Sequence, residues 1–371
     1  MAARKPAPKA RDDEKDQILK LRMRRALWAQ GYHCPVRVDL SHFEFKETGR
    51  LDRMSITDID VLGIRFDPDL RRRVVVADCK SGAESGPNRM FWLSGIMRFF
   101  GADEGFFVKP SVNRHARPLA SKLDIRVVDD KALEVLENGV NAESIKVRVG
   151  DKEADDFFID NWGIKVPSGE APTEGQIRVK SVFHYVQFMY WVMDEYRNIA
   201  NIIDRFHHIK NDIDPFNVSH KILGYVGLQR LTLSILNMAS VVYSRDVNEL
   251  DRQIKLYFFG GTFFLRERER TVELLNNLFG SENDVMSLEP SYFGELSEIT
   301  NRLIKNSSPS SKLLLHSDAV IYSFIVGGSD VKADMGNEYS LESIILLRRI
   351  ADFFVKSAEM PPEMFHELSV L

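Results

Sequence analysis

The sequence predicts an α/β domain, with a mixed sheet flanked by helices, followed by an all-α domain. In residues 12–160, short segments rich in β-branched and aromatic residues alternate with stretches of helical apolar spacing. Beyond residue 176 the apolar spacing is helical nearly to the end. The stretch 161–176 is rich in Gly and Pro and has no periodicity, so we interpret it as a linker to a second domain at 177–371. Residues 1–11 are basic and rich in Pro and Ala, which predicts a mobile tail.

The first domain is expected to begin with an amphipathic helix from Asp12 to Gly31, because acidic residues open it and apolar residues follow at helical spacing. A meander of three strands is expected next, at 36–45, 56–66 and 72–78. The remaining expected elements are a helix at 88–100, a strand at 105–109, a helix at 113–123 and a strand at 125–128. This order predicts a mixed sheet covered by helices on both faces.

The second domain is expected to consist of helices only. They are predicted at 179–206, 221–243, 248–259, 263–279, 292–304, 311–325 and 341–357. A dense aromatic run over 183–191 fits core packing, and it also fits a dimer or partner interface. We expect this domain to oligomerise, to sense a signal or to dock a partner.

Charge is distributed unevenly along the 371 residues, whose formal net charge is −4. Residues 1–150 carry +6 and the remainder −10, so the first half is expected to face an anionic partner. The two cysteines, Cys34 and Cys79, exclude a disulfide framework and fit a reducing, cytoplasmic compartment. The N-terminus lacks a signal-peptide core, and no apolar stretch approaches the roughly 20 residues of a membrane span, so we expect no membrane association.

One predicted hairpin gathers four charged side chains at one end. If its turn centres on Asp69, Asp60 lies opposite Asp78, and Asp58 lies opposite Lys80. Both faces of the hairpin are apolar further along the strands, so we expect it to lie between packed layers. The four charged groups are therefore expected to be partly removed from water.

This set of side chains predicts phosphodiester hydrolysis. Two carboxylates held close together in desolvated surroundings repel each other, so one must take up a proton or both must share a cation. Oxygen ligands with net negative charge favour Mg²⁺ or Mn²⁺. Lys80 could position a metal-bound water, accept its proton or stabilise charge developing on a phosphate. The alternative is a plain salt bridge of Asp58 or Asp60 with Lys80 at a strand end.

The pattern D-x(17)-D-x-K formed by Asp60, Asp78 and Lys80 resembles the PD-(D/E)xK nuclease superfamily, which has the restriction-endonuclease-like fold. The Gly31-Tyr32 pair that closes the first helix, and the tripeptides IDV and DCK that contain the two acids, are most similar to the Mrr-type restriction endonuclease branch. The resemblance covers about residues 12–130. It implies a Mg²⁺-dependent nuclease.

The resemblance also implies roles for individual residues. Asp60 and Asp78 would be metal ligands, the backbone carbonyl of Cys79 a further ligand, and Lys80 the catalytic lysine. Ile59 stands where the proline of the motif would be.

Many members of the superfamily carry a glutamate on the first helix, facing the metal. This chain has Gln17 and Lys20 near that place, with Glu14 earlier. We keep Asp58, Glu14 and Gln17 as auxiliary candidates, which leaves open whether one or two metal ions are bound.

A nucleic acid is the expected partner, and DNA is favoured over RNA by the resemblance alone, as is a role in restriction or defence. Basic and polar side chains near the later strand ends could contact phosphates. The candidates are Asn88, Arg89, Arg114 and Lys122. The alternative function is a non-catalytic nucleic-acid-binding or scaffold protein that retains a nuclease fold.

Overall fold

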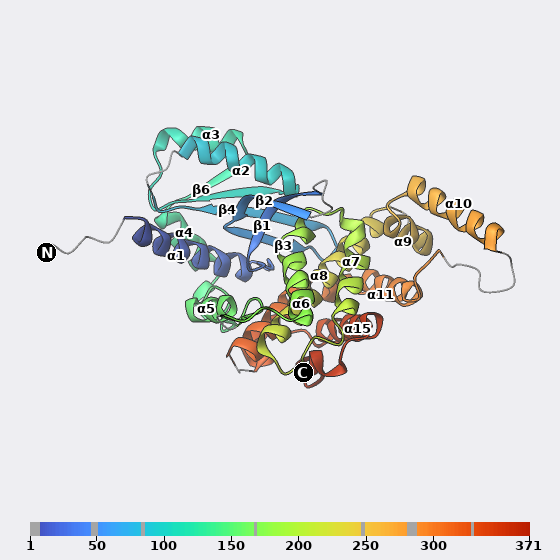
Figure 1. Ribbon diagram of the computed structural model, residues 1–371. Coiled ribbons are helices and arrows are strands. Elements are labelled where there is room, and N and C mark those ends of the chain that lie inside the picture. Colours follow the sequence, from blue (N-terminus) through green and yellow to red (C-terminus); the bar gives the residue numbers. More distant parts are fainter. Residues whose placement is uncertain are drawn as a thin grey trace.

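The computed structural model describes residues 8–45, 51–82, 86–166, 169–245, 249–279, 288–327 and 330–371. It shows a small mixed sheet with flanking helices, followed by a second half built of helices (Figure 1). The coarse architecture expected from the sequence is therefore confirmed. In the described parts of the chain, no helix is both long and apolar enough to cross a membrane.

The first helix, α1 (Pro8–Ala29), begins earlier than expected. Residues 8–11 belong to this helix rather than to the expected tail, and residues 1–7 lie outside the described residues. The helix ends where Gly31 adopts a positive φ of 88°, a backbone conformation that glycine reaches without steric cost.

The central sheet has four strands in the order β3-β4-β5-β6. β3 (Val61–Phe66) and β4 (Arg72–Cys79) are antiparallel, while β5 (Glu104–Val108) and β6 (Ile125–Val128) run parallel to β4. Val61 pairs with Ala77, which is the hairpin register that the sequence predicts. The carboxyl ends of β4, β5 and β6 therefore meet at one edge of the sheet.

The strand expected at 56–66 is broken at Asp60, so the expected three-stranded meander is wrong. Its first part belongs to β2 (Leu51–Ile59), which pairs with β1 (Val38–Phe45) in a separate two-stranded sheet. At the break, the Asp60 carboxylate accepts the Cys79 backbone N–H at 2.8 Å. The Asp60 side chain thus accepts the Cys79 N–H, which a backbone carbonyl would accept if the β3–β4 ladder continued.

Helices cover the four-stranded sheet on both faces, as expected (Figure 1). On one face, Leu62 and Val76 share an apolar cluster with Met90 of α2 (Gly86–Phe100). On the other face, Val75 shares a second cluster with Met23 of α1 and with α4 (Asp130–Gly139). α3 (Arg117–Lys122) follows η1 (Arg114–Ala116) and packs beside β6.

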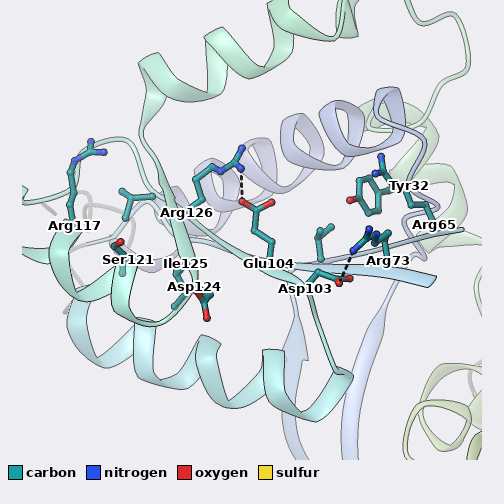
Figure 2. Close-up of a pocket in the computed structure, with 13 residues that line it drawn as sticks. Tyr32, Arg65, Arg73, Asp103, Glu104, Arg117, Ser121, Asp124, Ile125 and Arg126 are labelled. Atoms are coloured by element: carbon teal, nitrogen blue, oxygen red, sulfur yellow. Dashed lines mark hydrogen bonds and ion pairs between the residues drawn. The ribbon is translucent and has the colours of Figure 1, made fainter. Parts of the chain in front are cut away.

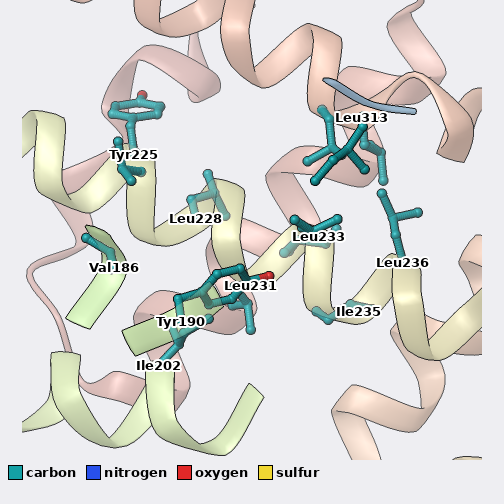
Figure 3. Close-up of a cluster of buried hydrophobic side chains, with 14 of the residues drawn as sticks. Val186, Tyr190, Ile202, Tyr225, Leu228, Leu231, Leu233, Ile235, Leu236 and Leu313 are labelled. Carbon is teal, nitrogen blue, oxygen red and sulfur yellow. The ribbon is translucent and has the colours of Figure 1, made fainter. Parts of the chain in front are cut away.

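The second half contains most of the helices. They are α5 (Lys152–Asp160), α6 (Glu174–Gln187), η3 (Met189–Trp191), η4 (Glu195–Arg197), α7 (Asn198–His208), α8 (Val218–Tyr243), α9 (Leu250–Phe258), α10 (Thr262–Phe279), α11 (Phe293–Lys305), α12 (Ser307–Ser311), α13 (Leu313–Val320), η6 (Ile321–Gly327), α14 (Val331–Met335), η7 (Gly336–Glu338), α15 (Leu341–Ala358), η8 (Pro362–Phe365) and α16 (His366–Ser369). Apolar side chains of α8 form the middle of this half, together with side chains of α6, α7 and α13 (Figure 3).

The single helix expected at 179–206 is interrupted between α6 and α7. There the Asn198 side chain accepts a hydrogen bond from the Tyr185 hydroxyl at 2.9 Å and donates to the Tyr190 carbonyl at 3.1 Å. A side-chain amide bonded to the backbone competes with a continuous helical ladder. The aromatic run is therefore folded into the core, and both Tyr185 and Tyr190 are buried.

Candidate active site

Three predicted residues, Asp60, Asp78 and Lys80, meet at the carboxyl end of β4. The Lys80 Nζ lies 3.2 Å from a carboxylate oxygen of Asp60 and 4.0 Å from one of Asp78. The side chains of Asp60 and Asp78 are only 3% and 0% exposed, whereas that of Lys80 is 19% exposed. Because Asp60 directly precedes β3 and Asp78 lies in β4, the hairpin register alone brings the acids together.

The Asp60 carboxylate has two amine partners. In addition to Lys80, the Nζ of Lys20 on α1 lies 2.5 Å from its second oxygen. Burial disfavours the charged form, but attraction to Lys20 and Lys80 and the Cys79 N–H outweigh it, so the pKa of Asp60 is below its ordinary value. Asp60 therefore stays ionised at neutral pH.

The Asp78 carboxylate is bound by Arg89 of α2. The Arg89 Nε donates to one oxygen at 2.9 Å, and an Nη donates to the other. The guanidinium also lies 4.2 Å from the ring centre of Trp92. Burial, joined by repulsion from Asp60, raises the pKa of Asp78, and the Arg89 contact opposes this. The two neighbouring acids thus have pKa values shifted in opposite directions.

Asp16 and Lys20 of α1 are functional candidates that the sequence analysis did not select. Asp16 accepts the backbone N–H of Ser81 at 2.5 Å, directly after Lys80. Lys20 lies one helical turn further on the same face and bonds Asp60. Asp16 and Lys20 are four residues apart and lie next to Leu19 and Met23, which are buried, so they belong to the side of α1 that faces the sheet. This spacing is the sequence pattern from which the two residues could have been predicted.

The auxiliary candidates have no described contact with Asp60 or Asp78. Asp58 lies opposite Asp39 in the two-stranded sheet, and the β3–β4 ladder ends at Val61 and Ala77, so the expected pairing of Asp58 with Lys80 does not form. The Asp58 carboxylate lies 3.9 Å from the Lys20 Nζ. Glu14 is exposed, and Gln17 is half-buried one residue after Asp16.

The proposed nucleic-acid contacts are divided between the two edges of the sheet. Arg89 is at the site, where it pairs with Asp78 rather than lying free for a phosphate. Asn88 is exposed in the first turn of α2, and Arg114 is exposed in η1, which follows the carboxyl end of β5. Lys122 ends α3 just before β6 begins, so it lies at the opposite edge of the sheet from Asp78.

A cavity of about 440 Å³ lies at the same edge of the sheet as Asp78. It is lined by Ser81 and Gly82, which directly follow Lys80, and by Lys109 and Asn113, which follow β5. Asp60, Asp78 and Lys80 do not line this cavity themselves.

A larger cavity, of about 760 Å³, lies at the opposite edge, around the amino ends of β4, β5 and β6 (Figure 2). Its charged side chains pair with one another, as Arg126 does with Glu104 at 2.7 Å and Arg73 with Asp103 at 3.4 Å. Size alone would favour this cavity. However, Asp60 and Asp78 lie at the other edge of the sheet, and we place the candidate site there.

The donor chemistry of the site fits a hard divalent cation. Mg²⁺ in proteins keeps several waters and is held by one or two carboxylates, so Asp60 and Asp78 suffice, and the Cys79 carbonyl remains a predicted further ligand. Among the described residues, no three His, Cys, Asp or Glu side chains gather closely enough to form a ligand cage by themselves. The present partners of the two acids are Lys20, Lys80 and Arg89, and a cation would have to compete with them.

No protein-family model, no curated protein and no solved structure is detectably similar to this chain.

Proposed function

We propose that the protein is a metal-dependent nuclease that hydrolyses nucleic-acid phosphodiesters, with a DNA endonuclease of restriction or defence type as the specific form. The observation that carries this proposal is the contact of one lysine, Lys80, with two buried carboxylates, Asp60 and Asp78, at the end of a hairpin. The order of strands and helices around this hairpin supports a restriction-endonuclease-like domain.

Asp60 and Asp78 would hold a Mg²⁺ or Mn²⁺ ion, which when bound would supply an activated water for the hydrolysis. Lys80 is mostly buried, so its ammonium would act in a partly water-excluded site, where it would orient the nucleophile and stabilise charge on the phosphate.

Cleavage assays test this proposal. Plasmid and single-stranded DNA, and single-stranded RNA, would be incubated with the protein and Mg²⁺, Mn²⁺ or EDTA, beside Asp78→Asn, Lys80→Met and the control Glu134→Gln. Glu134 is an exposed acid on α4. We expect cation-dependent cleavage that Glu134→Gln retains and the two site variants lose by roughly a hundredfold or more. Equal cleavage by all variants, or no cleavage with either cation, would contradict the proposal.

A non-catalytic nucleic-acid-binding or scaffold protein is the second candidate, and one observation favours it. Arg89 and Lys20 already neutralise Asp78 and Asp60, so the carboxylates are satisfied by the chain itself. In that case Asp78→Asn and Lys80→Met would leave nucleic-acid binding unchanged in a mobility-shift assay, and cleavage would be absent throughout.

A further inference from the structure

The α10 helix projects from the second half of the molecule (Figure 1). The chain turns between α9 and α10 at Gly260 and Gly261, whose φ angles are 81° and 104°. A side chain at Gly260 would collide with the Tyr196 ring, because its Cβ would lie 2.7 Å from that ring. The direction in which α10 leaves the body is therefore set by a glycine turn and not by a loose loop.

The start of α10 is anchored by two aromatic contacts. The Phe264 ring stacks on the Tyr196 ring at 6.5 Å between centres, and the Arg268 guanidinium lies 5.4 Å from the Phe259 ring centre. These contacts hold the helix in a defined orientation beyond the glycine turn.

Most of the apolar surface of α10 has no cover within the described chain. None of the side chains from 262 to 277 is buried. Phe263, Phe264 and Leu274 are 70%, 47% and 63% exposed. At 100° per residue, these three side chains lie on one side of the helix, and Leu275 continues that side. An exposed apolar face on a projecting helix is typical of an interaction surface.

The charges of α10 favour a second copy of the same helix. Residues 262–277 contain three arginines and three glutamates, so the helix is neutral although the second half of the chain is acidic. Arg270 lies beside the apolar face and pairs with Glu267 of the same helix at 2.8 Å. In an antiparallel two-fold pair that sets Phe263 opposite Leu274, Arg270 of each helix also lies opposite Glu267 of the other, whereas a parallel pair places like charges together.

We propose that α10 pairs antiparallel with α10 of a second copy of this chain, burying Phe263 and Leu274 between them. The two-fold arrangement closes the interface, so the expected assembly is a dimer and not an open chain. This inference is independent of the nuclease chemistry, because α10 is distant in sequence from every residue of the candidate site.

Sedimentation velocity of the full chain over a dilution series tests the pairing, beside Leu274→Glu and the control Phe216→Glu. Phe216 is exposed in the turn before α8, outside α10. We expect a wild-type dimer whose dissociation constant rises about tenfold or more in Leu274→Glu and stays unchanged in Phe216→Glu, with the circular dichroism of all three alike. A monomeric wild type, a Leu274→Glu dimer as tight as the wild type, or equal effects of both variants would overturn the proposal.

A charge exchange tests the antiparallel direction. Arg270→Glu places two glutamates against each other at both ends of the pair and should weaken the dimer about fivefold, while Arg270→Glu with Glu267→Arg, which restores opposite charges within each helix and across the pair, should restore it. Failure of the double variant to recover would overturn the antiparallel pairing.

Discussion

Asp60 is held by two ammonium groups and one backbone N–H, and it is almost fully removed from water. The pKa of Asp60 is below its ordinary value in the folded chain. As the pH falls, the unfolded chain therefore binds this proton before the folded chain does, and the stabilisation by Asp60 is lost below its ordinary pKa of about 4.

Replacing Asp60 by Asn should lower the free energy of unfolding by about 2–3 kcal/mol at neutral pH, because Lys20 and Lys80 lose their carboxylate. The difference from wild type should shrink as the pH falls below about 4. Urea unfolding at a series of pH values measures this, with the exposed Glu134→Gln as control. A difference that stays constant down to the lowest pH would show that folding does not lower the pKa of Asp60.

Arg89 binds Asp78 through two nitrogens, a geometry that lysine cannot reproduce. We expect Arg89→Lys to lower the free energy of unfolding by about 1–3 kcal/mol, since a buried carboxylate loses one partner. Arg98→Lys, an exposed position on the same helix, should change it by less than about 0.5 kcal/mol. Equal effects of the two substitutions in urea unfolding would count against a structural role for the Arg89 pair.

At the scale of residues, the sequence predicts the site residues that one hairpin brings together. It does not predict the site residues that another element, α1, contributes. Asp60, Asp78 and Lys80 follow from a turn position and a two-residue alternation along strands. Lys20 and Asp16 depend on the angle at which α1 crosses the sheet, which apolar periodicity does not determine. The predicted roles of the three hairpin residues stay predictions.

At the scale of elements, breaks in regular structure come from side chains that bond the backbone. The sequence predicts one strand through Asp60 and one helix over 179–206, because β-branched residues and apolar spacing continue across both breaks. In the structure Asp60 accepts the Cys79 N–H, and Asn198 bonds the Tyr190 carbonyl. Such bonds depend on partners distant from the local pattern, and propensity does not reveal them.

Close helix packing in the second half depends on a glycine. A Cβ at Gly227 of α8 would lie 2.4 Å from the Phe206 ring of α7. We expect Gly227→Ala to lower the free energy of unfolding by about 1–3 kcal/mol, because the ring must move. A Cβ at Gly95 of α2 would meet no atom within 4 Å outside its own stretch of helix. Gly95→Ala should therefore raise the free energy of unfolding by about 0.5–1 kcal/mol. Calorimetric melting of both variants measures these changes in stability. A Gly227→Ala variant more stable than the wild type would contradict the described contact.

At the scale of the whole molecule, the two halves share one apolar cluster, which includes Trp28 near the start and Leu368 near the end. Polar contacts also cross between them: His33 lies 2.8 Å from Asp318, and Gln187 donates to Asp39 at 2.7 Å. The sequence predicts a linker at 161–176, and that division into two domains stays a prediction, since local composition does not show how much surface the halves share.

We expect both halves to unfold together, because a shared core is lost as a unit. Tryptophan is present in both, with Trp28 and Trp92 in the first and Trp162 and Trp191 in the second. Urea unfolding followed by tryptophan fluorescence and by far-ultraviolet circular dichroism should give coincident midpoints. Two separated transitions would show that the halves are independent in stability.

We predict that Asp60 and Asp78 together bind a divalent cation used for cleavage. Titration with Mn²⁺, followed by electron paramagnetic resonance of the free ion, tests it most directly on the wild type, Asp60→Asn, Asp78→Asn and the control Glu134→Gln. We predict saturable binding by the wild type and the control, and a loss of affinity of roughly tenfold or more in both site variants. Unchanged binding in the two site variants, or no binding by the wild type, would contradict the account.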